Sequence, residues 1–195
     1  MTTYLDRIVA SSEDRDVWLT ARNGGVTASN AAKLSSLDSI DSILKGKFFD
    51  GFTGNPATEW GLEREPFLLD WAGFPQNKYL FSSAENARFM ATPDGIRPAT
   101  TGDYAIDLCQ VKTTGKPMNK IPAHYMRQIQ WEMYVMEANR CHFVWEVHEN
   151  FVPVSLEPNV LIVERDDEAI ASLIKLAGAF LVRLDEANAF QKEMQ

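Results

Sequence analysis

Apolar residues recur along this chain with two different periods, and the two patterns predict a mixture of helices and strands. Spacings of three and four residues are typical of amphipathic helices. The helices expected on this basis cover residues 12–23 with Ser12 as N-cap, a short segment opening at Thr27, residues 58–71 with Thr58 as N-cap, residues 122–136, and residues 166–193 capped by Asp166 or Asp167. The segment 35–57 is rich in Ser, Asp, Gly and Pro, so we expect a loop-rich connection there.

Two of these helices carry a clear apolar stripe. The stripe of the helix at 58–71 comprises Trp60, Phe67, Leu68 and Trp71. The stripe of the C-terminal helix comprises Ile170, Leu173, Ile174, Ala177, Phe180, Leu181 and Leu184. We expect both stripes to face the core.

Alternating apolar and polar positions, with many β-branched and aromatic residues, predict the strands. They are expected at residues 88–92, 104–113, 141–148 and 160–164. Pro93-Asp94-Gly95 has the composition of a turn, and residues 100–103 have that of a loop, so the first two strands are expected to form a hairpin. The order of helix, hairpin, helix and strand predicts an α/β fold with a central mixed sheet flanked by helices.

The composition is that of a single globular domain covering residues 1–195, with 45% hydrophobic and 24% charged residues. No run of about 18 apolar residues is present, so we expect no membrane span. The first residues show no basic stretch followed by an apolar one, which argues against a signal peptide. Cys109 and Cys141 lie in strand-like surroundings, and we expect free thiols in a reducing cytoplasm.

The net charge of −8 argues against a polyanionic partner, but the charges are unevenly distributed. From Leu108 to Trp131 the chain has no acidic residue and four basic ones, Lys112, Lys116, Lys120 and Arg127. From Glu146 onward, ten acidic residues are opposed by four basic ones. The central part of the chain is therefore locally basic and the C-terminal part acidic.

Candidate chemistry is concentrated at the predicted hairpin. On an extended strand Gln110 and Lys112 project to one face, whereas Asp107, Cys109 and Val111 project to the other. An Asp at the end of the neighbouring strand, Asp94, can then meet Gln110 and Lys112. Mg2+ takes oxygen ligands and keeps several waters, and a lysine beside such a water can orient it. The alternative is a chance turn sequence next to a solvated lysine.

Three further groups extend this pattern. Glu65 lies on the predicted helix at 58–71, as a metal ligand or as a solvated helix charge. Gln130 and Tyr134 share one face of the helix at 122–136, and Gln128 points elsewhere, so the two glutamines cannot face one site equally. Arg22 and Ser29 lie near a helix start, as a phosphate pocket or as a surface arginine and a plain serine.

In order along residues 15–148, the chain resembles the phage lambda exonuclease and YqaJ-type viral recombinase family of the PD-(D/E)XK nuclease superfamily. The segments that carry the resemblance are Trp18, Arg22, Gly25 and Thr27-Ala28-Ser29; Trp60-Gly61-x3-Glu65; Thr92-Pro93-Asp94-Gly95; Gln110-x-Lys112; and Tyr125-Met126-x-Gln128-x-Gln130. Gln130-x3-Tyr134 is also similar to a motif of the RecB-like members. Each segment is weak singly, and their order and spacing together are specific.

The resemblance implies a restriction-endonuclease-like core and an Mg2+-dependent (or Mn2+-dependent) 5′-to-3′ exonuclease acting on ends of double-stranded DNA in phage recombination or repair. It implies that Glu65 and Asp94 hold the metal and that Lys112 lies beside the attacking water. It further implies a 5′-phosphate pocket, lined by Arg22, Ser29, Thr92 and one of Gln128 or Gln130, with Tyr134 nearby. The implied partners are DNA, a single-strand annealing protein and further copies of the chain in a ring, in the cytoplasm of a bacterial host.

Gln110 departs from the family pattern, which has Glu or Asp at this third metal-binding position. A neutral amide oxygen binds a hard cation less strongly than a carboxylate does. Three interpretations stay open: a natural working variant, an inactivating change, or a protein that has lost catalysis and binds DNA ends. A structure-specific flap or junction endonuclease with the same metal site is the alternative enzymatic function.

Overall fold

The computed structural model describes residues 3–49 and 54–193 and is built around a mixed sheet. Its strands are β4 (Gly95–Pro98), β5 (Ile106–Thr114), β6 (Ala138–Glu149), β7 (Val152–Pro153) and β8 (Asn159–Glu164). β5 pairs antiparallel with β4 and parallel with β6, and β6 pairs antiparallel with β7 and β8. Because parallel neighbours require a long crossover, the helix α5 (Ala123–Met136) connects β5 to β6.

A second, three-stranded antiparallel sheet lies beside the first. It consists of β1 (Ile8–Ser11), β2 (Tyr79–Ser82) and β3 (Met90–Ala91), and the short 3-10 helix η1 (Tyr4–Arg7) precedes it. A backbone bridge between Gln76 and Gly95 joins the segment before β2 to the start of β4. The chain between β3 and β4, residues 92–94, therefore passes from one sheet directly to the other.

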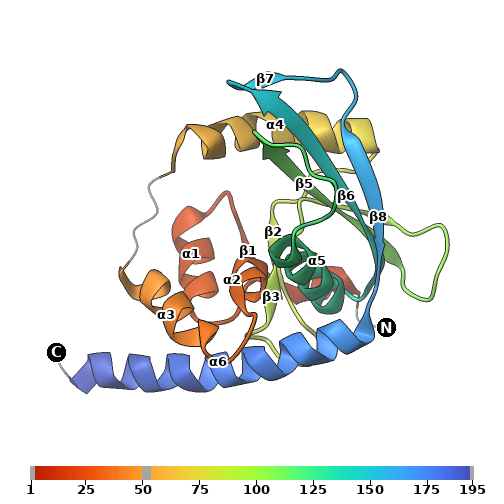
Figure 1. Cartoon of the computed structure of the whole chain (residues 1–195). Helices are drawn as coiled ribbons and strands as arrows, with labels where there is room; N and C mark the ends of the chain where they lie inside the picture. The colour runs from red at the N-terminus through yellow and green to blue at the C-terminus, as the bar shows by residue number, and fades with distance from the viewer. Residues whose placement is uncertain (1–2, 50–53, 194–195) are drawn as a thin grey trace.

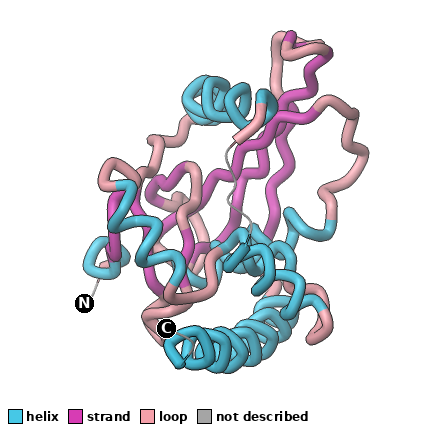
Figure 2. The backbone as a smooth tube through the Cα atoms, turned by 90° about the vertical axis from the view of Figure 1, so that its left-hand side faces the viewer, coloured by secondary structure: helices cyan, strands magenta, loops and turns pink. Residues whose placement is uncertain are grey.

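Helices cover both faces of the five-stranded sheet (Figures 1 and 2). The helices of the described chain are α1 (Arg15–Asn23), α2 (Ala28–Lys33), α3 (Ser39–Phe49), α4 (Pro56–Ala72), α5 and α6 (Asp167–Glu193). α4 packs Leu68 and Leu69 against Cys109 and Val111 of β5. On the other face α5 packs against β6, and the long helix α6 packs against α5 (Figure 1).

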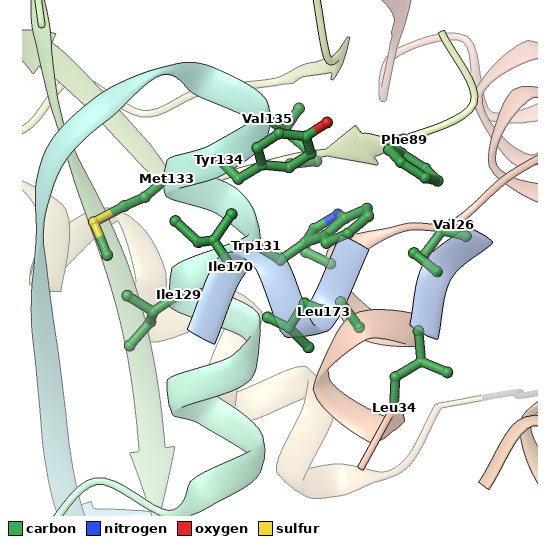
Figure 3. Packing of buried hydrophobic residues seen from close by; sticks show 14 of the residues in the cluster. Val26, Leu34, Phe89, Ile129, Trp131, Met133, Tyr134, Val135, Ile170 and Leu173 are labelled. Carbon is green, nitrogen blue, oxygen red and sulfur yellow. The ribbon is translucent and has the colours of Figure 1, made fainter. Parts of the chain in front are cut away.

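The main apolar core lies around α5, between the five-stranded sheet, the three-stranded sheet and the helices α2, α3 and α6. Figure 3 shows Trp131 of α5 at its centre, with Phe89 on one side and Ile170 and Leu173 of α6 on the other. The rings of Phe89 and Trp131 meet edge-on with centroids 5.1 Å apart, and the indole Nε1 of Trp131 donates to the carbonyl oxygen of Met90 at 3.0 Å. This contact fixes α5 to β3, and therefore to the chain that leads into β4.

Several sequence predictions are confirmed. The short helix capped by Thr27, the helix that follows Pro122, the strands at 141–148 and 160–164, and the long C-terminal helix lie within one to three residues of their expected bounds. In α6 the expected stripe is buried, except that Ile174 is only half-buried. Cys109 and Cys141 are buried free thiols. Within the described part of the chain, no helix is long and apolar enough to cross a membrane.

Two expected helix caps were wrong. The N–H of Ser12 donates to the carbonyl of Lys78 at 2.8 Å, so Ser12 continues the β1–β2 pairing and Asp14 caps α1 instead. In α4 the side chain of Asn55 accepts from the N–H of Thr58 at 3.0 Å. Asn55 is therefore the N-cap, and Pro56 takes the first helical position, where its missing N–H costs nothing.

The predicted stripe of α4 was also wrong in part. Phe67 is 44% exposed and Trp71 is 42% exposed, while Leu68 and Leu69 are buried against β5. The guanidinium of Arg64 lies 4.3 Å from the ring centroid of Phe67 and covers part of that exposed ring. The helix thus rests on a narrow pair of leucines rather than on its aromatic residues.

The loop-rich connection predicted at 35–57 contains the helix α3, and residues 50–53 of it lie outside the described residues. Ile40, Ile43 and Leu44 of α3 are buried, at spacings of three and one. Three apolar positions among Ser and Asp residues gave a signal that was too weak to outweigh the composition.

The predicted hairpin has a different first strand. The strand at 88–92 is reduced to β3, which pairs with β2, whereas β4 is the antiparallel partner of β5. β4 begins with Gly95 and ends with Pro98, two residues that are unfavourable in strands, so the sequence pattern assigns it to a turn and loop. β1 and β2 were missed because each has only four residues.

We expect Gly95→Ala to destabilise the protein by about 1–3 kcal/mol through overpacking. A Cβ at this position would lie 2.8 Å from Leu69 Cδ2 and 2.9 Å from Phe74 Cβ, which leaves no room under α4. Gly178→Ala is the matched control, because nothing lies within 4 Å of its added Cβ and it is helical. Urea unfolding should show Gly178→Ala stabilised by up to about 1 kcal/mol; equal effects of the two changes would contradict the packing described.

Candidate active site

A cavity of about 340 Å3 opens between α4 and the adjoining part of β5, beside the chain that enters β4. It is lined by Ala57, Thr58, Gly61, Leu62, Glu65 and Leu68 of α4, by Asp94, and by Val111, Lys112 and Thr113 of β5. The structure therefore brings together Glu65, Asp94 and Lys112, which the sequence singled out separately.

Asp94 is held at the exact point where β4 begins. β4 pairs with β5 from Gly95 opposite Cys109, so the N–H of Val111 lies just beyond the ladder and lacks a strand partner. Asp94 Oδ2 accepts from this N–H at 2.8 Å and also from the side-chain amide of Gln110. Burial raises the pKa of Asp94 to about 6; Glu65 adds to the rise, and Lys112 and the two hydrogen bonds oppose it.

Glu65 faces the cavity from α4, and its Oε1 accepts from Gln76 Nε2 at 3.0 Å. Its neighbour Arg64 points elsewhere and forms an ion pair with the buried carboxylate of Glu146 on β6. Adjacent charged residues of α4 thus have different tasks, since one faces the cavity and the other anchors the helix to the sheet.

The predicted alternation along β5 is confirmed. Cys109 and Val111 pack under α4, whereas Gln110 contacts α5 through Gln128. The ammonium Nζ of Lys112 lies 5.5 Å from the ring centroid of Tyr125, also on α5. The edge of β5 near Asp94 is therefore shared by groups from both flanking helices.

A chain of side-chain hydrogen bonds runs from Asp94 into α5. Gln110 donates its amide to Asp94, and its Oε1 accepts from Gln128 Nε2 at 3.0 Å. The same Gln128 Nε2 donates to Glu132 Oε1 at 2.9 Å. Because a carboxylate can only accept from Gln110, the acceptor Asp94 fixes the orientation of the amide, and the carbonyl of Gln110 points to Gln128.

Glu132 was missed by the sequence analysis. Its side chain is fully buried, and Oε2 has no hydrogen-bond partner among the described residues. Burial raises the pKa of Glu132 to about 8; the nearby Asp94 adds to the rise, and Gln128 and Lys112 oppose it. The available signal was an acidic residue within the otherwise apolar or amide run of residues 129–136, all of which are buried.

Arg22 and Ser29 form a second polar group, as predicted. Arg22 Nη2 donates to Ser29 Oγ at 2.9 Å, and its guanidinium lies 4.2 Å from the ring centroid of Trp18. Lys47 Nζ donates to the carbonyl oxygens of Arg22 at 2.9 Å and Gly25 at 3.1 Å. Burial, with the neighbouring charges of Arg22 and Arg88, lowers the pKa of Lys47 to about 8. Lys47 is therefore a third member of this polar group, and the sequence did not indicate it.

The backbone joins this second group to the cavity. Val26 and the chain at 88–90 exchange two hydrogen bonds of 2.8 Å, from Val26 N to Arg88 O and from Met90 N to Val26 O. Two residues beyond Met90 comes Thr92, whose Oγ1 is buried without a partner in the described structure, and then Asp94. The connection between α1, which carries Arg22, and α2, which carries Ser29, is thus fixed to the segment that places Thr92 and Asp94.

The structure does not bring Gln130 and Tyr134 to this group. Gln130 is buried, and it donates to the carbonyl of Glu164 and accepts from the N–H of Asp166, each at 2.9 Å. The hydroxyl of Tyr134 donates to Glu85 Oε2 at 2.9 Å. Of the two candidate glutamines, Gln128 is the one that reaches the neighbourhood of Asp94.

The residues of the cavity suit Mg2+ or Mn2+. Mg2+ is commonly held by one or two carboxylates together with waters, and Glu65 and Asp94 supply two carboxylates to one cavity. Among the residues that the structure describes, no group of three or more His, Cys, Asp or Glu is close enough to form a complete protein cage. An open site with two carboxylates and water is the arrangement that fits.

Comparisons with known proteins agree with this fold. The YqaJ-like viral recombinase domain matches residues 17–139. An alkaline exonuclease (LHK-Exo) from Laribacter hongkongensis superposes with a TM-score of 0.66 at 25% identity, over 92% of this chain and 97% of that one. LHK-Exo in complex with dAMP gives 0.64 at the same identity and coverage. A phage-related exonuclease from Haemophilus somnus 129PT gives 0.65 at 16% identity, over 88% and 96% of the two chains. No curated protein matches the sequence.

The mixed sheet and its flanking helices, with the similarity to LHK-Exo, define a nuclease of the PD-(D/E)XK superfamily. Within it, the chain belongs to the YqaJ-like viral recombinase family, whose domain matches more than half of its length. The predicted family, fold class and enzyme class are thereby confirmed.

We expect the metal-free protein to lose stability as the pH rises from about 5 to about 8. The folded protein binds the proton of Glu132 up to about pH 8, whereas the unfolded chain releases it near the ordinary value of 4.5. A group that binds one proton more in the folded state than in the unfolded state lowers the free energy of unfolding by at most about 1.4 kcal/mol for each unit by which the pH rises. Asp94 acts in the same direction.

Glu132→Gln should remove part of this slope, because the amide does not ionise. The measurement is urea unfolding in the presence of a chelator at several pH values. The control is Asp70→Asn, which removes an exposed acid of α4. Parallel slopes for the unaltered protein and Glu132→Gln would mean that Glu132 is not the titrating group.

Proposed function

We propose that this protein is a divalent-metal-dependent DNA exonuclease that degrades one strand from a 5′-phosphorylated end. The observation that carries the proposal is the convergence of Glu65, Asp94 and Lys112 on one cavity. The structural similarity to LHK-Exo, an alkaline exonuclease, supports the same activity.

Glu65 and Asp94 would hold the ion, Mg2+ or Mn2+, through carboxylate oxygens that face the cavity. A divalent ion bound there supplies Lewis-acid stabilisation of the charge that develops on the scissile phosphate. The hydrogen bonds from Val111 and Gln110 hold Asp94 Oδ2, so the carboxylate keeps a fixed orientation. Glu65 is oriented in turn by Gln76.

Lys112 orients the attacking water and supplies positive charge beside the phosphate. Its Nζ lies over the ring of Tyr125, which restricts the long side chain to the face of β5 from which Gln110 also projects. Attack of the water on phosphorus breaks the bond to the 3′ oxygen of the terminal nucleotide. That oxygen takes up a proton and leaves as a 3′-hydroxyl, and the new 5′-phosphate stays on the remaining strand.

Arg22 and Ser29, with Thr92 and Gln128, would receive the terminal 5′-phosphate. The guanidinium of Arg22 is positioned by the ring of Trp18 and by Ser29 Oγ. A charge-assisted bond from Arg22 would distinguish a phosphate from a hydroxyl end. The unpartnered hydroxyl of Thr92 is a further donor between this group and Asp94.

The setting that we propose is phage recombination in a bacterial cytoplasm, with a ring of subunits around DNA and a single-strand annealing protein as recipient of the product. The charge distribution supports such a ring, because basic groups gather in the central part of the chain while the region from Glu146 onward is acidic. We further propose that residues 1–195 form one domain.

Asp94→Asn should lower metal-dependent cleavage by roughly a thousandfold or more, since several kcal/mol of transition-state stabilisation depends on the metal. Asparagine keeps an acceptor for the N–H of Val111, so the fold should persist. The assay is digestion of end-labelled linear and circular DNA with Mg2+ or chelator, with Asp70→Asn as control. Full activity of Asp94→Asn would contradict the site, and equal cleavage of circular DNA would indicate an endonuclease.

Arg22→Ala should slow digestion of 5′-phosphorylated ends about ten- to a hundredfold more than digestion of 5′-hydroxyl ends. The reason is the loss of a charge-assisted hydrogen bond to the phosphate. Arg183→Ala, which removes an exposed cation of α6, is the matched control and should slow neither substrate. If Arg22→Ala slows the digestion of both kinds of end equally, the result contradicts the proposed 5′-phosphate pocket and the 5′-to-3′ polarity that depends on it.

A further inference from the structure

We infer that Glu132 of α5 supplies the negative charge that Gln110 does not supply to the metal site. The inference rests on the proposed function, because it concerns the same cation between Glu65 and Asp94. It assigns a role in metal binding to a helix residue that lies outside the cavity lining.

The first argument is the orientation of Gln110. Its amide donates to Asp94 and its carbonyl accepts from Gln128, so the side chain presents a donor and not an oxygen ligand to Asp94. Position 110 thus holds the Asp94 carboxylate in place without adding charge. A hard divalent cation beside Asp94 gains less from this position than it would from a carboxylate.

The second argument is that Glu132 has no cationic partner. Two other buried carboxylates in the described structure have an arginine partner: Asp107 pairs with Arg140, and Glu146 pairs with Arg64. Glu132 is fully buried and forms no ion pair there, and its Oε2 has no hydrogen-bond partner. Ionising a carboxyl group buried in this way is costly unless a cation balances its charge.

The third argument is position. Gln128 and Glu132 are one helical turn apart, and Gln128 Nε2 contacts both Glu132 Oε1 and Gln110 Oε1, at 2.9 Å and 3.0 Å. The Glu132 carboxylate therefore lies beside the Gln110 carbonyl, on the side of β5 from which Gln110 reaches Asp94. Because Mg2+ keeps most of its ligands as water, a carboxylate can strengthen binding without belonging to a closed cage of protein ligands.

The test is Mn2+ binding to the full chain without DNA, measured by calorimetry. Glu132→Gln should weaken Mn2+ binding by at least about tenfold. The double variant Gln110→Glu with Glu132→Gln moves the carboxylate from the helix to the strand, and it should recover most of the lost affinity. In a double-mutant cycle, Gln110→Glu should raise the affinity more in the Glu132→Gln background than in the unaltered chain.

Asp107→Asn is the matched control, because it also removes a buried carboxylate but one that is held by Arg140 on the opposite face of β5. It should lower the unfolding temperature and leave Mn2+ affinity unchanged. A purely structural Glu132 would behave in the same way, so unchanged Mn2+ affinity in Glu132→Gln overturns the inference. If Glu132→Gln does not fold, the Mn2+ affinity of the single variant Gln110→Glu decides the question. A rise of about a hundredfold or more would mean that the site had lacked a carboxylate, and it would overturn the inference.

Asp94→Asn separates this inference from the proposed function. Lost Mn2+ binding in Asp94→Asn together with unchanged binding in Glu132→Gln defeats the role of Glu132 alone. Unchanged binding in Asp94→Asn defeats the metal site itself, and with it the proposed function.

Discussion

The hydrogen bond from the Val111 N–H to the Asp94 carboxylate determines where the site can form. β4 is shorter than β5, so the backbone of β5 beyond Cys109 has no strand partner on that side. Asp94 fills the gap with its side chain, and an unpaired buried N–H is thereby avoided. The same carboxylate is directed toward the cavity under α4, so the end of a strand ladder and the start of a catalytic site are one structural feature.

Burying this carboxylate has consequences for everything near it. Burial raises the pKa values of Asp94 and Glu132 above their usual range; the charge of Glu65 adds to the rise for Asp94, and that of Asp94 adds to the rise for Glu132. Lys112 offsets part of this cost, and two glutamine amides distribute hydrogen bonds among the acids. A protein whose buried acids are costly to ionise gains stability from a cation that balances their ionised forms.

Long periodic segments and local chemistry were predictable from the sequence, whereas short strands and burial were not. α5, β6, β8 and α6 follow from periodicity, and the alternation of Gln110 and Lys112 against Cys109 and Val111 follows from strand geometry alone. α3 was hidden by its Ser and Asp content, and β4 by its Gly and Pro. The exposed aromatic residues of α4 show that hydrophobicity does not determine which face is buried when the neighbouring sheet is unknown.

α5 shows most clearly why the rest required a structure. Gln128 and Gln130 are two residues apart and chemically identical, yet one joins the network at Asp94 and the other ties α5 to the junction of β8 and α6. Glu132, one turn from Gln128, follows it toward Asp94, since residues four apart share a helix face. α5 is also the crossover between β5 and β6, and Trp131 fixes it to β3 through the carbonyl of Met90. Because the segment after β3 carries Asp94, the packing of α5 sets the position of its polar face relative to that carboxylate, and a change in the core at Trp131 would alter the site at a distance.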